Sequence, residues 1–166
     1  MDVNAKKIIV ASAIVGILIY LKNKMNKNLF SGAFRKLSIN SPFGIRGGKP
    51  HKGNDLFGKT GDKIFVKKSG KVLRVQKNCK VGNTKCGGGW GNFVEIQHTP
   101  TIKTLYAHLT NVFVNSGDTI EPYEIIGTLG NTGNSRGAHL HWEYFENGKQ
   151  IDGKNFMNDY FGIELT

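Results

Sequence analysis

The sequence predicts an all-β domain that follows an N-terminal transmembrane helix. Two observations predict the β domain. Short apolar runs recur about every ten residues after residue 45, and 22 glycines in a chain of 166 residues supply many tight turns. The helix is predicted because the segment from Ile8 to Leu21 carries no charge and has lysines on both sides. The length suits one domain with its own core plus this appendage.

The apolar runs of the β domain are separated by turn signals. Segment 63–77 (KIFVKKSGKVLRVQK) holds two runs about a Ser-Gly turn, and residues 91–98 (GNFVEIQH) alternate between the two faces of a strand. Segments 103–109 (KTLYAHL) and 124–130 (EIIGTLG) continue the pattern. The pair Asn147-Gly148 is the strongest short hairpin signal. It is expected to close a strand that begins near Ala138.

The uncharged N-terminal segment allows three interpretations: an uncleaved membrane anchor, a cleaved signal peptide or a buried helix. Its 14 residues fall short of the ~20 that a hydrocarbon core requires, and its length also fits a signal peptide. No small-residue cleavage site follows promptly, since Ser31-Gly32-Ala33 lies far downstream. We therefore prefer an uncleaved anchor, whose flanking lysines reach the interface, over a cleaved signal or a buried helix. The predicted organisation is an anchor at 1–24, a basic linker at 25–40 and a domain at 41–166.

The positive charge is concentrated near the N-terminus. The net charge is +11, and residues 1–39 hold seven Lys and Arg against one acid, so more than half of the excess lies there. This charge suits an anionic membrane or cell wall. A nucleic-acid partner is disfavoured because no basic stripe is interleaved with aromatic residues. Five of the seven basic residues follow the apolar segment, a distribution that would keep the domain in the cytoplasm. Delivery on the membrane of a virus particle is one way to reconcile this orientation with a substrate in the cell wall.

Histidines gather in three short motifs. His139 and His141 stand two apart in a run expected to be extended, so both side chains point to one face. His51 and Asp55 stand in the motif HKGND, and His108 ends the run TLYAHL. Taken singly, each residue also has a structural explanation as a turn cap, a loop residue or a strand histidine. Together they suggest one site.

Four motifs in this order resemble the M23 family of zinc metallopeptidases, the lysostaphin and LytM type, which cut peptide cross-links in bacterial cell walls. They are GIRGGKPHKGNDL (44–56), LYAHL (105–109), GTLGNTGNSRG (127–137) and HLHWE (139–143). The resemblance covers residues 41–157. It implies an antiparallel sheet with the site in a surface groove. It also implies one Zn²⁺ per chain held by His51, Asp55 and His141, with His108 and His139 as the catalytic pair.

The chemistry fits this assignment. Catalytic zinc sites use three protein ligands and leave the fourth position to water. The spacing of His51 and Asp55 places both on one face of an extended segment, and Gly53 between them has no side chain to obstruct an ion. Of His108 and His139, one is expected to act as general base and the other to donate a hydrogen bond to the oxyanion. The sequence does not distinguish which does which.

Some other positions depart from the family pattern, and for others the sequence allows more than one role. Asn54 stands where the family usually has an aliphatic residue, which puts a polar group near the expected metal. Residues 77–92 form an insertion in which Cys79 and Cys86 could form a disulfide in an oxidising space, free thiols being the alternative. Trp90 is expected either to edge the groove or to anchor its loop. His98 is expected to be an exposed turn residue.

We therefore predict a membrane-anchored zinc endopeptidase that hydrolyses peptide cross-links of peptidoglycan, in the bacterial envelope or as a virion-associated lytic enzyme. Its expected partners are peptidoglycan peptides, the lipid membrane through the N-terminal helix, and other envelope or virion proteins. Two alternatives of the same fold stay open. One is a non-catalytic wall-binding module, and the other is a structural membrane protein of an envelope or virion.

Overall fold

The computed structural model describes residues 36–164 together with the single residue Ile17. The predicted anchor apart from Ile17, and residues 25–35 of the predicted linker, lie outside the described residues. Within residues 36–164, no helix is long and apolar enough to cross a membrane. The boundary predicted at residue 41 falls at the end of the first strand, β1 (Ile39–Ser41).

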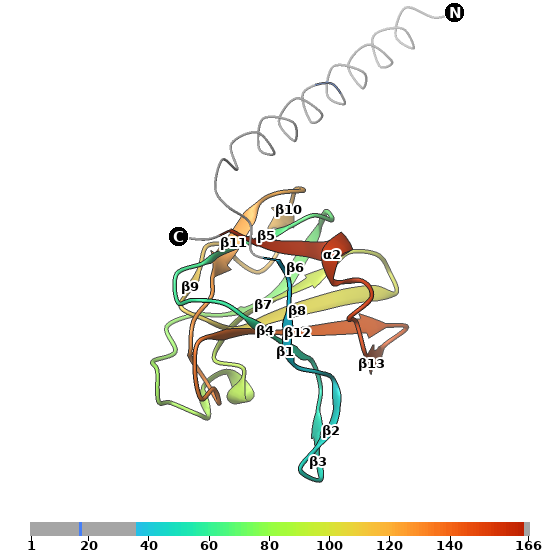
Figure 1. Ribbon diagram of the computed structural model, residues 1–166. Helices are drawn as coiled ribbons and strands as arrows, with labels where there is room; N and C mark the ends of the chain where they lie inside the picture. Colours follow the sequence, from blue (N-terminus) through green and yellow to red (C-terminus); the bar gives the residue numbers. More distant parts are fainter. Residues whose placement is uncertain (1–16, 18–35, 165–166) are drawn as a thin grey trace, which may run out of the picture. The chain divides into compact units, whose positions relative to one another are not determined.

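The described part of the chain is built from antiparallel sheets, as predicted (Figure 1). The larger sheet has the strand order β1, β4 (Asn54–Phe57), β12 (His139–Glu146), β8 (Ile102–Leu109), β7 (Asn92–Gln97), β6 (Gly70–Gln76) and β10 (Thr119–Ile120), and β13 (Lys149–Ile151) pairs with β12. The smaller sheet has the order β14 (Phe161–Glu164), β5 (Lys63–Val66), β11 (Ile125–Thr128) and β9 (Asn111–Val112). A separate hairpin of β2 (Gly44–Arg46) and β3 (Lys49–His51) projects from the domain.

Residues 36–164 also contain two short helical segments. The 3-10 turn η1 (Cys86–Gly89) lies in the insertion, and α2 (Met157–Tyr160) leads into β14. Cys79 and Cys86 are joined by a disulfide that closes the insertion into a small loop. Of the two alternatives expected for these cysteines, a disulfide or free thiols, the structure contains the disulfide.

The main core lies between the two sheets. Leu56, Leu140 and Trp142 of the larger sheet pack in one cluster with Ile64 and Phe161 of the smaller sheet, and all five are fully buried. The Phe161 ring lies 5.1 Å from the Trp142 ring, measured between centroids. Burying side chains of this size contributes roughly 1.5–3 kcal/mol each. The core therefore fixes the position of β12, the strand that carries the HxH motif.

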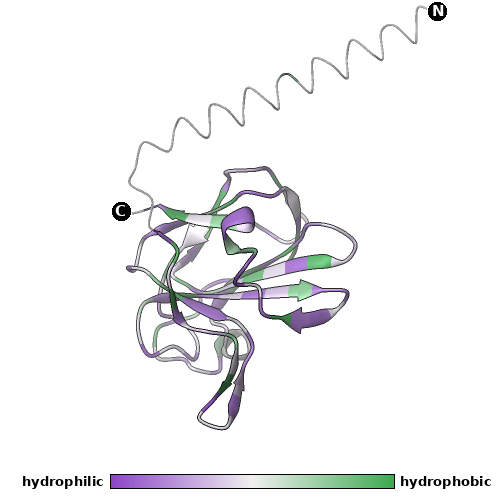
Figure 2. Ribbon diagram, turned by 45° about the vertical axis from the view of Figure 1, so that its right-hand side comes forward, coloured by the Kyte–Doolittle hydropathy of each residue, from purple (hydrophilic) through white to green (hydrophobic). Residues whose placement is uncertain are grey.

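Successive residues of the long strands point to opposite faces of the larger sheet. Hydrophobic and hydrophilic residues alternate along these strands, which gives them banded colour in Figure 2. On β12 the even-numbered residues Leu140, Trp142 and Tyr144 face the core. The odd-numbered residues face the opposite side, where a second small cluster includes Phe145. This opposite side is the one on which the histidines lie.

Two local predictions have clear outcomes. Asn147 and Gly148 join β12 to β13, and both have positive φ, as a tight two-residue hairpin requires. His98 is not an exposed turn residue. Its ring is half-buried, contacts the Ser69 carbonyl (2.9 Å) and the Thr104 hydroxyl (2.8 Å), and packs edge-on against Tyr160. The Thr-Pro sequence after it gave no sign of these partners, which are distant along the chain.

Candidate metal centre and groove

Three predicted ligands converge on one point. His51 Nε2 lies 3.1 Å from Asp55 Oδ1 and 3.2 Å from His141 Nδ1, and the last two atoms are 2.7 Å apart. All three residues are buried. Ligands of a tetrahedral zinc ion, at about 2.1 Å from the metal, lie about 3.4 Å from one another. One histidine nitrogen from each ring and one carboxylate oxygen therefore fit a single zinc ion.

The chain reaches this geometry in a different way from the one expected. His51 ends β3 and Asp55 lies in β4, so the two residues do not share one extended segment. The chain bends between them, at Gly53, where a Cβ atom would lie 2.6 Å from the Trp142 carbonyl oxygen and 2.8 Å from the His141 ring. Glycine is required here because the backbone passes against β12 and the His141 ring.

Asn54 does not lie under the metal centre. It is opposite Trp142 in the pairing of β4 with β12, whereas Asp55 is opposite His141. Consecutive strand residues point to opposite faces. The buried Asn54 amide accepts a hydrogen bond from the Phe43 backbone N–H (3.1 Å) and donates one to Asp152 (3.0 Å). This departure from the family pattern is thus satisfied on the far side of the strand.

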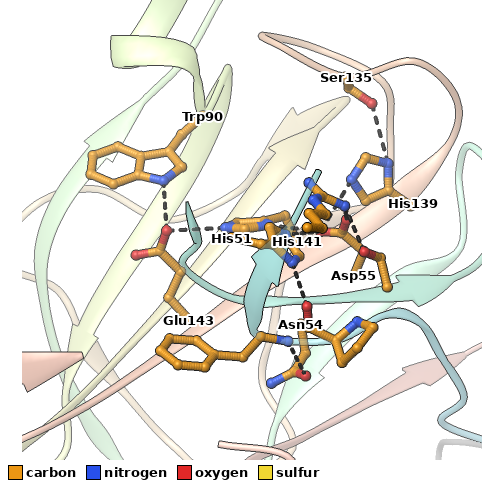
Figure 3. A network of polar contacts seen from close by, with 12 residues as sticks. His51, Asn54, Asp55, Trp90, Ser135, His139, His141 and Glu143 are labelled. Carbon is orange, nitrogen blue, oxygen red and sulfur yellow. Dashed lines mark hydrogen bonds and ion pairs between the residues drawn. The ribbon is translucent and has the colours of Figure 1, made fainter. Parts of the chain in front are cut away.

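Hydrogen bonds orient the four groove histidines. The Nδ1 atoms of His51, His108 and His139 each lie 2.8 Å from a backbone carbonyl, those of Pro42, Thr132 and Gly137 respectively. A carbonyl oxygen can only accept, so each Nδ1 carries the proton and each Nε2 offers its lone pair. His141 has the opposite arrangement. Its Nε2 lies 3.0 Å from Glu143 Oε1, which leaves Nδ1 for the metal (Figure 3).

A β-bulge directs His108 into the groove. Simple alternation along β8 would place His108 on the core side with Tyr106. The pairing of β7 with β8 shifts register between Asn92 and Val94, and His108 has a φ of 63°. Positive φ is uncommon outside glycine and concentrates at functional sites. The extra residue turns the His108 ring to the groove side and returns Leu109 to the core.

The surroundings shift the pKa values of three site residues in different directions. Burial, followed by the charges of the nearby His139 and His141, lowers the pKa of His108 to about 4 against the opposing effects of the Thr132 carbonyl and Asp55. Burial alone would raise the pKa of Asp55, but hydrogen bonds and charges from His139 and His141 outweigh it and the pKa is lowered. For His141, burial opposes protonation, yet bonds to Asp55 and Glu143 raise its pKa to about 9. His108 is therefore neutral and Asp55 ionised at neutral pH.

The site lies in a groove with a basic rim. The groove is lined by the five predicted site residues and by the side chains of Arg46, Lys49, Lys52 and Arg136. Arg46 bonds to Asp55 Oδ2 at 3.1 Å. Lys49, Lys52 and Arg136 are exposed and form no ion pair with a described carboxylate. Both acids of the groove, Asp55 and Glu143, are buried at the centre. The rim therefore presents uncompensated positive charge.

The insertion forms one wall of the groove. Trp90 follows η1, lines the groove and donates a hydrogen bond from its indole N–H to Glu143 Oε1 at 2.9 Å (Figure 3). Its carbonyl accepts the backbone N–H of His108 at 2.8 Å. Trp90 therefore lies at the edge of the groove and also anchors its loop, so both expected roles are combined.

Two residues that contact the candidate ligands were not assigned a role from the sequence, namely Glu143 and Arg46. Glu143 stands two residues after His141, so the spacing that put His139 and His141 on one face also puts Glu143 there. That signal was present in HLHWE. Arg46 gave no such signal, because its contact with Asp55 depends on the fold of the β2–β3 hairpin.

The family model described as peptidase family M23 matches residues 49–153, well over half of the chain. The chain belongs to this family. Among its curated relatives, the peptidoglycan DD-endopeptidase ShyC of Vibrio cholerae is 35% identical over 100 residues, which are 60% of this chain and 21% of the relative. The chain spans between 20% and 31% of the length of the first relatives that it matches.

Solved structures of M23 proteins share this fold. The catalytic domain of the prophage-encoded M23 protein EnpA from Enterococcus faecalis superposes with a TM-score of 0.61 at 26% identity, over 76% of this chain and 96% of that one. The catalytic domain of lysostaphin from Staphylococcus simulans gives 0.55 at 26% identity, over 81% and 96%. A zinc-containing peptidase from Vibrio cholerae gives 0.58 at 28%, over 72% and 36%. The lysostaphin-type fold expected from the motifs is confirmed.

Proposed function

We propose that this protein is a zinc endopeptidase that hydrolyses peptide cross-links of bacterial peptidoglycan. The observation that carries the proposal is the convergence of His51, Asp55 and His141, whose candidate ligand atoms all lie within 4.8 Å of one another in a groove. His108 and His139 line the same groove, so neither a ligand nor a proton-transfer residue is missing from the expected set. Zinc, when bound, acts as a Lewis acid that activates water and polarises a peptide carbonyl.

The two remaining histidines have separable roles. His108 is held by Thr132, is neutral at neutral pH because its pKa is about 4, and has no hydrogen-bond partner for its Nε2 among the described residues. We assign to it the acceptance of a proton from the attacking water. His139 sits across the groove with a ring centroid 4.7 Å from that of His108. We assign to the imidazolium form of His139, whose Nε2 lies 3.5 Å from Asp55 Oδ1, the hydrogen bond from Nε2–H that stabilises the oxyanion of the tetrahedral intermediate.

The charge of the rim favours a substrate with carboxylates. Three exposed cations without described acidic partners surround the metal centre. Peptidoglycan stem peptides carry free carboxylates, whereas oligoglycine bridges are neutral. We therefore propose cross-links between stem peptides as the substrate, which agrees in chemistry with the endopeptidase activity named for ShyC.

Digestion of purified cell walls tests this function. The zinc-loaded protein is incubated with walls that have stem-to-stem cross-links and with walls that have oligoglycine bridges, and released fragments are identified by mass. Release of uncross-linked stem peptides, lost with a chelator and restored by zinc, is expected. Wall binding without any release would favour the non-catalytic module, and absence of both binding and release would favour a structural role.

The location is a separate part of the proposal. We propose that the uncharged residues 8–21 anchor the domain to the bacterial envelope or to a virion membrane, which the sequence supports through its flanking lysines. Fractionation of the full chain against a variant without residues 1–24 tests this. Recovery of both proteins in the soluble fraction would contradict the anchor and leave the enzymatic proposal intact.

A further inference from the structure

We propose that Glu143, held in place by Trp90, positions His141 for the metal and sets the zinc affinity of the site. This inference rests on the metal centre of the proposed function. It assigns a task to two residues that are neither ligands nor proton-transfer groups.

His141 is the groove histidine whose orienting partner is a carboxylate. The Ser135 hydroxyl also lies 3.2 Å from His139 Nδ1, beside the Gly137 carbonyl. Backbone carbonyls hold the other three rings, whereas Glu143 Oε1 accepts the Nε2–H of His141 at 3.0 Å. This bond fixes the tautomer whose Nδ1 points to His51 and Asp55. A carboxylate behind a ligating histidine also makes the imidazole a stronger ligand. Because the orienting group is a side chain, it can be changed by substitution without disturbing the backbone.

Glu143 is almost fully buried, yet only one of its two carboxylate oxygens has a hydrogen-bond partner among the described residues. Only 1% of its surface is exposed, and its Oε2 has no hydrogen-bond partner among the described residues. An ionised carboxylate in such a place is costly unless a positive charge lies close by. No Lys or Arg forms an ion pair with Glu143 in the described residues. Its ion-pair partner among the described residues is the ring of His141, through which a cation at the metal centre would compensate the charge.

Trp90 keeps Glu143 in this rotamer. The indole N–H donates to the same oxygen, Oε1, that accepts from His141, at 2.9 Å. The loop that carries Trp90 is fixed at several points. The Asn134 backbone N–H donates to the Gly89 carbonyl at 2.7 Å, and the nearby disulfide joins Cys79 to Cys86. The insertion, which the common family pattern lacks at this length, thereby supports the metal ligand from behind.

Zinc affinity of the full chain, measured by competition with a chromogenic chelator, tests the proposal. Glu143→Gln keeps the shape of the side chain and removes its charge, and we expect its zinc affinity to fall about 10- to 100-fold. Trp90→Phe keeps the ring and removes one hydrogen bond, for which about fivefold is expected. Glu146→Gln removes the same charge from the same strand outside the groove and is expected to leave the affinity unchanged.

A measurement on the unsubstituted protein guards against variants that fail to fold. In the zinc-loaded chain, nitrogen-15 NMR of the imidazoles is expected to show the proton of His141 on Nε2. A proton on Nδ1 would overturn the proposal, as would a Glu143→Gln variant that folds and binds zinc like the original chain. If the original chain binds no zinc, the proposed metal centre itself fails. Unchanged affinity in Glu143→Gln with normal zinc binding in the original chain would refute this inference alone.

Discussion

The two faces of β12 are both buried, yet they stabilise the protein by different means. Leu140 and Trp142 have no exposed surface and pack among apolar side chains of both sheets. His141 and Glu143, alternating with them, are 7% and 1% exposed, and polar atoms lie at hydrogen-bond distance from both His141 ring nitrogens and from Glu143 Oε1. Burial alone therefore does not separate a core from a site. The distinction lies in whether the buried atoms need partners of defined position and charge.

The largest expected effect is the loss of zinc binding and activity when His141 of β12 is substituted, in contrast to its neighbour Leu140. His141→Ala removes a ligand, so zinc binding and wall digestion should fall to the level of the chelator-treated protein. Leu140→Ala should lower the free energy of unfolding by about 2–5 kcal/mol, while the molecules that stay folded bind one zinc ion. Equilibrium unfolding and metal analysis of the two variants provide the measurement. A Leu140→Ala protein that is fully folded but without zinc would break the proposed division between the faces.

A smaller but still large effect is expected for the proton-transfer pair. His108→Ala and His139→Ala should each reduce the rate of wall digestion by about 10²- to 10⁴-fold. Zinc should stay bound, because neither residue is a predicted ligand. His98→Ala provides a matched histidine outside the groove, and its activity per folded molecule should not change. Unaltered digestion by either groove variant would show that its assigned role is wrong even with zinc present.

A third test uses pH to compare the two faces of β7. Burial alone would raise the pKa of Glu95, but Arg74 and Lys103 outweigh it and the pKa is lowered from 4.5. Because the folded pKa is the lower one, this contribution is present above pH 4.5 and is lost as the pH falls through the folded value. Glu95→Gln should therefore cost about 1 kcal/mol at neutral pH and progressively less in acid.

The control for this pH test lies on the other face of the same strand. Val94 is fully buried in the main core, and Val94→Ala should cost about 2 kcal/mol. Its cost should not vary with pH, because no titratable group is removed. Denaturant unfolding at several pH values measures both variants. A Glu95→Gln cost that stays constant down to low pH would contradict the stated cause of the pKa shift.

The smallest expected effect concerns the rim. Lys52→Gln or Arg136→Gln should lower kcat/KM for a carboxylate-bearing stem peptide by about two- to fivefold at low salt, and added salt should reduce the difference. The carboxamide form of the same peptide should show no such loss. Lys149→Gln, an exposed lysine on β13, serves as the control. Equal losses for both peptide forms would remove the argument for an anionic substrate.

The sequence predicted the β class, the β12–β13 hairpin and the three residues that converge in the candidate metal centre. Prediction succeeded there because local periodicity and short motifs encode those features. It failed where distant segments meet. The face that His108 occupies depends on a bulge opposite β7, and the half-buried state of His98 depends on Tyr160 far along the chain. The reason for glycine at position 53 likewise became evident only from the contact with β12.

Gly91 and Gly133 touch through their backbones. A Cβ atom on Gly91 would lie 2.4 Å from the Thr132 carbonyl carbon, and one on Gly133 would lie 2.3 Å from the Gly91 nitrogen. Both residues also have positive φ. The loop of Trp90 and the loop that leads to Ser135 are therefore locked together. Anyone who wishes to graft a new specificity onto this scaffold must transplant the two loops as one unit, with both glycines retained.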